Sequence, residues 1–125
     1  MVTISIFLDN QTLFSIIKEK TKFEAGIQIK NIFSDLSDIT NKATLSDSQI
    51  IIISTDFKLA DFKLAIETLT KYFTEKQILI LSDNITDEYL QHCLRLGADG
   101  YIQTSENFVE DIKITKDRRW RVEHA

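Results

Sequence analysis

The sequence contains no proline, only three glycines and a single cysteine. Cys93 has no second cysteine with which to form an internal disulfide, and a multi-cysteine metal site is excluded for the same reason. The longest purely apolar runs, such as the isoleucine stretch at 50–53, have four residues, far fewer than the roughly 20 that a transmembrane helix needs. The N-terminal stretch also lacks the basic region and cleavage site of a signal peptide. We therefore expect a cytoplasmic protein without a membrane anchor.

Basic residues are fewer than acidic ones, and they are unevenly placed. The chain has 125 residues and a net charge of −4, with 15 lysines and arginines against 19 acids. Residues 113–125 hold five of the basic groups and two of the acids, so the first 112 residues carry a net charge of −7. Such an acidic body does not favour direct nucleic-acid binding. We expect one domain over residues 1–116, followed by a basic tail or linker at 117–125.

Two kinds of hydrophobic pattern alternate along the chain. Runs typical of strands lie at 3–8, 27–33, 50–53, 77–82 and 100–103, and helical patterns lie at 9–20, 35–46, 59–73, 87–96 and 106–116. This alternation predicts an α/β fold, in which helices cover both faces of a parallel sheet. Right-handed crossovers leave few strand orders, among them the flavodoxin-like order 2-1-3-4-5.

Several side chains have local roles in the predicted helices. Thr86 and Ser105 are suited to cap the last two helices, and Gly97 is suited to end the helix at 87–96. Helical spacing places Leu13, Ile16 and Ile17 on one face of the first helix, and it places Phe108, Val109 and Ile112 on the inner face of the last helix.

Short oxygen-bearing side chains follow the isoleucine run directly. Ser54, Thr55 and Asp56 stand where the buried strand ends, and open α/β sheets bind ligands at the carboxyl ends of their strands. These residues are therefore candidates for a site. The alternative is that the hydroxyls of Ser54, Thr55 and Ser82 only bond loop amides, and that Asp9 only caps the first helix.

Four segments, ISIFLDNQTLF (4–14), SQIIIISTDF (48–57), ILILSD (78–83) and LGADGYIQTS (96–105), resemble the signature regions of a bacterial response-regulator receiver domain. The similarity is greatest to receivers that precede LuxR-type DNA-binding domains, and it covers residues 3–112. It implies a flavodoxin-like (βα)5 three-layer sandwich with strand order 2-1-3-4-5. It also implies a role in signal transduction. Two arrangements are open: a longer native chain with a C-terminal DNA-binding domain, or a protein of 125 residues that stands alone.

The resemblance assigns site positions residue by residue. Receivers hold Mg²⁺ with two acids after the first strand and phosphorylate an aspartate that ends the third strand; a Ser or Thr ends the fourth strand and a lysine ends the fifth. The matching positions here are Asp9 and Asn10, Ser54, Ser82, and Thr104. Ser54 is a poor nucleophile without an adjacent base, and Thr104 has no charge to offer a phosphoryl group. The site is therefore expected to be a remnant.

These positions predict a degenerate receiver domain that binds a protein partner or a second copy of itself, without enzymatic activity or a cofactor. The surface that receivers commonly use would include Tyr89, Arg95, the strand-five aromatic Tyr101, and Phe108. One alternative is weak Mg²⁺ binding through Asp9 and Asp56. A second is a small flavin-binding or nucleotide-binding protein, which is disfavoured because the loop LDNQTLF contains no glycine for a phosphate.

Overall fold

Five parallel strands form one sheet in the order β2-β1-β3-β4-β5. The strands are β1 (Val2–Phe7), β2 (Ile27–Phe33), β3 (Ile50–Ser54), β4 (Gln77–Leu81) and β5 (Gly100–Ile102). The computed structural model describes residues 2–41, 45–84, 86–104 and 108–116. The predicted strand order is confirmed, and the strand bounds lie within one residue of those predicted.

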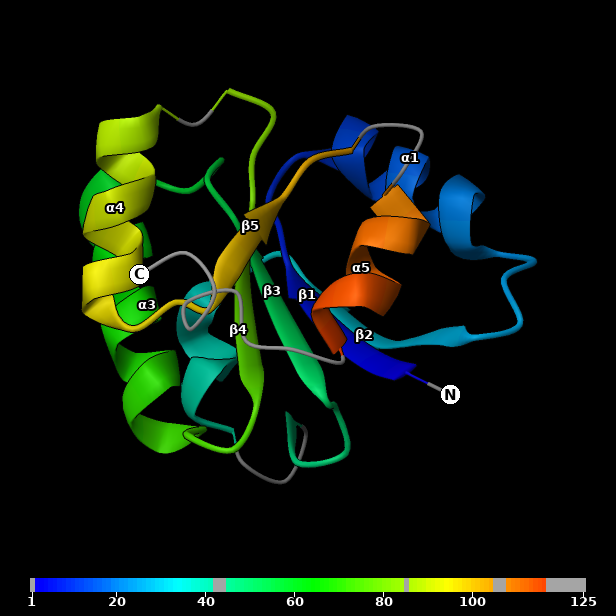
Figure 1. Cartoon of the computed structure of the whole chain (residues 1–125), viewed down its shortest axis with the longest axis horizontal. Coiled ribbons are helices and arrows are strands. Elements are labelled where there is room, and N and C mark those ends of the chain that lie inside the picture. Colours follow the sequence, from blue (N-terminus) through cyan, green and yellow to red (C-terminus); the bar gives the residue numbers. More distant parts are fainter. Residues whose placement is uncertain (1, 42–44, 85, 105–107, 117–125) are drawn as a thin grey trace.

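Helices cover both faces of the sheet (Figure 1). They are α1 (Gln11–Thr21), α3 (Leu59–Tyr72), α4 (Asp87–Leu96), α5 (Phe108–Lys116) and the short 3-10 helix η1 (Leu36–Thr40). Figure 1 shows α1 and α5 on one face and α3 and α4 on the other, while η1 packs beside α3. The result is the three-layer α/β sandwich predicted from the sequence.

The isoleucines of β3 supply the core on both faces of the sheet. Ile50 and Ile52 join the apolar cluster beneath α1 and α5, whereas Ile51 and Ile53 join the cluster beneath α3 and α4. All four are at most 1% exposed. Because a central parallel strand has no solvent-facing side, its sequence is a continuous apolar run.

Helix ends follow the predicted capping residues with one correction. The Thr86 hydroxyl accepts the Tyr89 N–H at 3.2 Å, and Gly97 ends α4 with a φ of 120°. The cap of α1 is Asn10, whose side chain accepts the N–H groups of Thr12 and Leu13. The suggestion that Asp9 caps this helix is therefore wrong by one residue. The predicted cap Ser105 lies outside the described residues.

Two other helix predictions needed adjustment. Where one helix was expected over 35–46, the structure describes the five-residue 3-10 helix η1 and a helical Leu45, whose N–H donates to the Asn41 carbonyl at 3.1 Å. In α1, Ile17 is fully buried and Leu13 is partly buried, but Ile16 remains 39% exposed. The inner face of α5 is as predicted, with Phe108, Val109 and Ile112 buried.

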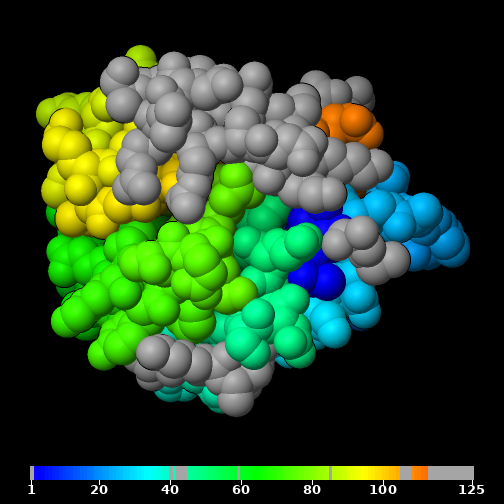
Figure 2. Space-filling model, turned by 60° about the horizontal axis from the view of Figure 1, so that its bottom comes forward, coloured from blue at the N-terminus to red at the C-terminus, as the bar shows by residue number. Residues whose placement is uncertain are grey.

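The amino ends of the strands are tied together by polar groups. The buried hydroxyls of Ser5 and Ser48 lie 2.6 Å apart, and the Lys76 ammonium donates to the carbonyls of Ser46 and Ser48. Figure 2 brings this edge of the sheet forward and shows the segment before β3 beside the segment before β4. These bonds join the segments at this edge, and the two hollows discussed below lie at the opposite one.

Among the helices that the structure describes, none is long and apolar enough to cross a membrane.

Candidate functional site at the carboxyl ends of the strands

A cavity of about 570 Å³ lies where β1, β3, β4 and β5 end. Its lining includes the following predicted site positions: Asn10, Ser54, Asp56, Ser82 and Thr104. Tyr89 from α4 also contributes to it. Asp9 does not, because it lines a separate groove with residues of η1 and α3. The sequence thus located most of this site, whereas Asp9, one of the expected metal ligands, lines the neighbouring groove.

The hydroxyls that end β3 and β4 are bonded to the loops that follow them. Ser54 is 2% exposed, and its Oγ accepts the Asp56 N–H at 3.3 Å. The Ser82 Oγ accepts the Asn84 N–H at the same distance. Both serines thus bond loop amides, which is the local role considered for them from the sequence. Thr55 instead uses its backbone N–H, which donates to the Leu81 carbonyl.

Asp56 fixes the loop between β1 and α1. One of its carboxylate oxygens accepts the Asn10 N–H at 2.8 Å, and both oxygens lie 3.2 Å from the Asp9 nitrogen. The backbone N–H groups of Thr12 and Leu13 donate to the side-chain oxygen of Asn10. The N–H groups of Asp9, Asn10, Thr12 and Leu13 at this helix start therefore already have acceptors. Fewer of them are left to hold a phosphate, which argues against the nucleotide-binding alternative.

Asp83 makes a corresponding contact on the other side of the cavity. Its carboxylate accepts the Thr104 backbone N–H at 2.7 Å and the Thr104 hydroxyl at 2.5 Å. The loop after β4 is thereby joined to the end of β5. Sequence analysis did not identify Asp83 as a site residue. The available signal was an acid directly after a serine at the end of a strand. Asp56 follows Ser54 in a similar way, two residues later.

The charge of the cavity is negative. Its lining contains the carboxylates of Asp56 and Asp83, and no lysine, arginine or histidine is found among the lining residues that the structure describes. A receiver needs a cation here to neutralise a transferring phosphoryl group. Where the resemblance places that lysine, the neutral side chain of Thr104 is bonded to Asp83.

The two carboxylates considered for weak Mg²⁺ binding belong to adjoining loops, since the Asp56 carboxylate accepts the Asp9 N–H at 3.2 Å. Asp56 lines the cavity and Asp9 lines the neighbouring groove. Within the described ranges, no group of three or more histidine, cysteine, aspartate or glutamate side chains is placed to hold a metal ion.

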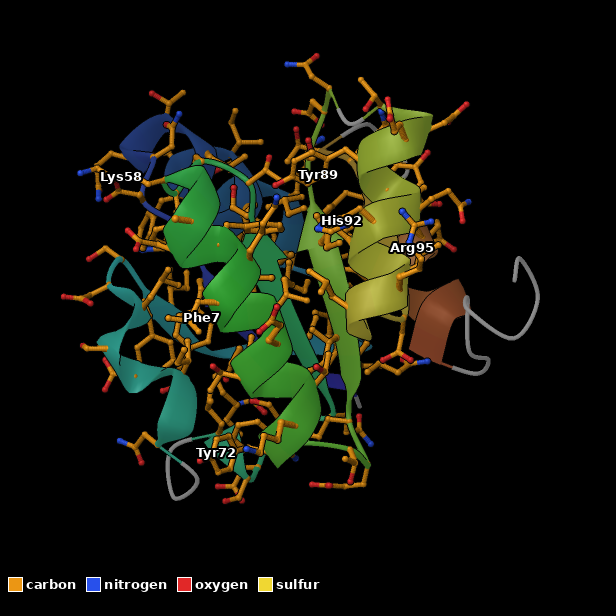
Figure 3. The ribbon with its side chains drawn as sticks, turned by 90° about the vertical axis from the view of Figure 1, so that its left-hand side faces the viewer. Phe7, Lys58, Tyr72, Tyr89, His92 and Arg95 are labelled. Atoms are coloured by element: carbon orange, nitrogen blue, oxygen red, sulfur yellow. The ribbon has the colours of Figure 1, made fainter. Side chains whose placement is uncertain are left out.

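The predicted interaction residues differ in how far they reach the surface. Arg95 is exposed, and Tyr89 and Tyr101 are half-buried against the core beneath α3 and α4. Figure 3 shows Tyr89 and Arg95 spaced along α4. Phe108 is fully buried, so its inclusion in a surface is wrong. The reason is that Phe108 begins α5 on the side that packs against the sheet.

Two ionisable side chains of α4 are affected by burial. Burial raises the pKa of the Cys93 thiol to about 11, with Lys63 acting in the opposite direction. Burial also raises the pKa of the Tyr89 phenol, and Cys93 adds to that effect. Both groups therefore stay protonated at neutral pH. Cys93 acts as a small apolar side chain in the core, as a buried thiol in such surroundings does.

Solved structures of similar architecture include receiver domains of response regulators. The signal receiver domain of a protein named as the response regulator NarL, from Mycobacterium tuberculosis, has a TM-score of 0.79 at 11% identity, covering 94% of this chain and 98% of that one. The REC domain of RcsB from Salmonella enterica serovar Typhimurium, solved with the phosphomimetic BeF3⁻, has a TM-score of 0.76 at 14% identity, covering 93% and 88%.

The chain has the fold of a response-regulator receiver domain. This fold is not restricted to transcription factors, because a Burkholderia pseudomallei protein described as pilus assembly-related has a TM-score of 0.78 at 14% identity, covering 95% of this chain and 94% of its own. No protein-family model matches the sequence, and no curated protein matches it either. At these identities the structural likeness defines the architecture, and the activity has to be argued from the site.

Proposed function

We propose that this chain is a degenerate receiver domain, which takes part in signal transduction or transcriptional regulation by binding a protein partner or a second copy of itself without aspartyl phosphorylation. In this proposal it is cytoplasmic and has no enzymatic activity. A DNA-binding domain in a longer native chain, as in the LuxR-type group, would give it a regulatory output. The receiver fold of its structural neighbours supports the signalling role.

The proposal rests on the identity and the hydrogen bonds of the residues that stand at the strand ends. The acceptor position holds Ser54, which is buried and bonded to a loop amide, and the lysine position holds Thr104, which is bonded to Asp83. Nucleophile and cation are therefore both replaced by short hydroxyl side chains with local structural bonds. What remains is a domain with helix and strand surfaces for a partner.

The direct test is to incubate the protein with Mg²⁺ and acetyl phosphate and to measure its intact mass at low pH, where acyl phosphates survive. We expect no added phosphoryl group, whereas an intact receiver treated in parallel gains one. Mg²⁺ alone should leave the melting temperature unchanged. Stabilisation by Mg²⁺ that is lost in both Asp9→Asn and Asp56→Asn would favour the weak metal site instead.

A set of restored variants tests whether the whole site has been lost or only its acceptor. Ser54→Asp returns the nucleophile but leaves the phosphoryl oxygens without a cation, and a missing electrostatic stabiliser typically costs on the order of 100-fold in rate. We therefore expect slow phosphorylation until Asn10→Asp and Thr104→Lys are added. Phosphorylation of Ser54→Asp alone at the rate of an intact receiver would contradict the proposal of a broadly dismantled site.

A further inference from the structure

A second hollow lies on the side of the molecule where η1 packs against α3. This η1–α3 groove has a volume of about 390 Å³ and is lined by Asp9, Ser34, Asp35, Leu36, Ile39, Phe57, Asp61, Leu64 and Ala65. Its volume falls in the range of roughly 300 to 1,000 Å³ in which proteins accept ligands and anchoring side chains. The groove is separate from the cavity at the strand ends, although both include Phe57.

The floor of the groove is apolar. Ala65 is buried, Leu36, Ile39 and Phe57 are half-buried, and Leu64 at the lip is 62% exposed. Beneath them Phe7 stacks on Phe33 with ring centroids 4.8 Å apart, and Figure 3 shows Phe7 between η1 and α3. The floor therefore packs on an aromatic pair of the core, and its own apolar side chains remain partly accessible to a ligand.

The rim of the groove carries charge of one sign. The ionisable lining residues are Asp9, Asp35 and Asp61, all exposed, and no basic residue lines the groove among those that the structure describes. Within the described ranges none of these three carboxylates forms an ion pair. Lys58, the N-cap residue of α3, follows a groove residue in the sequence but does not itself line the groove. An apolar floor with an acidic rim is complementary to an apolar segment flanked by cations.

We propose that the η1–α3 groove is a docking site for a basic amphipathic helix of a partner protein. The helix would place apolar anchors, spaced as i, i+3 or i+4 and i+7, onto Leu36, Ile39 and Leu64. Lysine or arginine side chains beside this stripe would face the three rim aspartates. The acidic charge of the first 112 residues favours encounter with such a partner. This site goes beyond the proposed function, because it lies away from α4 and β5 and does not depend on phosphorylation.

The test uses a fluorescent synthetic peptide of roughly 15 residues, long enough to form several helical turns, with leucines on one face and lysines elsewhere. Fluorescence anisotropy measures its binding to the full chain. We expect saturable binding, and roughly tenfold or more weaker binding to Leu64→Ser, since a buried leucine contributes enough apolar area for that change. Phe23→Ser is the matched control, because it removes another exposed apolar side chain outside the groove and should bind as the native protein does.

Charge is tested separately on the rim. The double variant Asp35→Asn with Asp61→Asn should weaken binding and flatten its dependence on salt. Asn keeps the capping bond that Asp35 makes to the Ser37 N–H, so the fold should be retained. Glu67→Gln with Glu75→Gln removes the same charge from exposed positions outside the groove, and it should have little effect.

Several results would overturn the proposal. Unchanged binding to Leu64→Ser, or equal binding of a scrambled peptide without an apolar face, would show that the groove is not used. Light scattering that detects a dimer of the native chain but not of Leu64→Ser would assign the groove to a second copy. Displacement of the probe by an equal or smaller concentration of the peptide KITKDRRWRVEHA, the sequence of residues 113–125, would assign it to this chain's own basic segment.

Discussion

At the scale of single residues, two aspartates hold the loops around the cavity. Asp56 binds the amides that follow β1, and Asp83 binds Thr104 at the end of β5. Hydrogen bonds to a carboxylate are stronger than those between neutral groups. The negative charges in this cavity are therefore engaged in positioning loops, which is a structural use of acids in a place where receivers use acids for chemistry.

The loop-fixing role of Asp56 predicts unequal effects of two alanine substitutions. Asp56→Ala removes the acceptor of the Asp9 and Asn10 amides, so we expect it to lower the free energy of unfolding by about 1–2 kcal/mol. Asp9→Ala changes the charge by the same amount but removes no described side-chain hydrogen bond, so its cost should stay below about 0.5 kcal/mol. Urea denaturation measures both, and equal losses would contradict a specific role for Asp56.

The sequence predicted the roles of single residues less well than it predicted the elements and the fold. The positions of Ser54, Ser82 and Thr104 were predictable because they follow from strand ends and from the resemblance. The partners of Asp56 and Asp83 were not, because these bonds connect loops 46 or 47 and 21 residues apart in sequence, and their geometry depends on the register of neighbouring strands. Phe108 is a different case, because helical spacing had already placed it on the inner face of the last helix, and its inclusion in the interaction surface conflicted with that spacing.

At the scale of elements, α4 has the most sharply defined ends. Thr86 caps its start, and its end is fixed by Gly97, which has a φ of 120° and lies against Thr70 of α3. The Thr70 hydroxyl oxygen also lies 3.2 Å from the Leu96 carbonyl oxygen, although the hydroxyl shares its single proton with the carbonyls of Ile66 at 2.9 Å and Glu67 at 3.1 Å. The end of α4 is thus attached to α3 by backbone conformation, close packing and a shared hydrogen bond.

This attachment predicts that Gly97→Ala is costly. A Cβ at this position would lie 2.8 Å from the Thr70 Cβ, and the positive φ is unfavourable for any side chain. We expect a loss of about 2 kcal/mol or more, measured by thermal or urea unfolding. Gly26→Ala is the matched control, because Gly26 does not have a positive φ, and it should change stability by less than about 1 kcal/mol. Similar effects at both glycines would contradict the role given to Gly97.

Elements themselves were largely predictable. The strand bounds and α3, α4 and α5 follow from hydrophobic periodicity, because burial on one or both faces dictates that periodicity. The segment at 35–46 was the exception. Its apolar residues Leu36 and Ile39 lie three apart, which fits one helical turn as well as a longer helix, so its pattern did not determine a length.

At the scale of the whole molecule, the sheet divides the interior into two apolar clusters, one beneath α1 and α5 and the other beneath α3 and α4. Tyr101 lies on β5 and packs against the second cluster. In a working receiver, phosphorylation at the strand ends would have to shift this side of the molecule. With Ser54 and Thr104 at those ends, no such input is expected.

The proposed loss of this input predicts that assembly does not respond to a phosphoryl mimic. Light scattering of the protein should give the same mass with and without beryllofluoride and Mg²⁺, whatever that mass is, because no aspartate is present at position 54 to bind the mimic. An intact receiver that dimerises on activation serves as the positive control. An increase in mass that depends on beryllofluoride would mean that the switch still operates.

The isoleucine strand also affects the risk of aggregation while the chain folds. β3 pairs with β1 and β4, whose partner residues lie some 46 positions before it and 27 after it, so its edges are satisfied only when distant segments have come together. Contacts this far apart in sequence form slowly. Until then, SQIIIIS is an uncharged, proline-free, β-branched segment of the kind that aggregates between chains. Complete burial of β3 therefore also removes from the native protein the segment most prone to amyloid-like pairing.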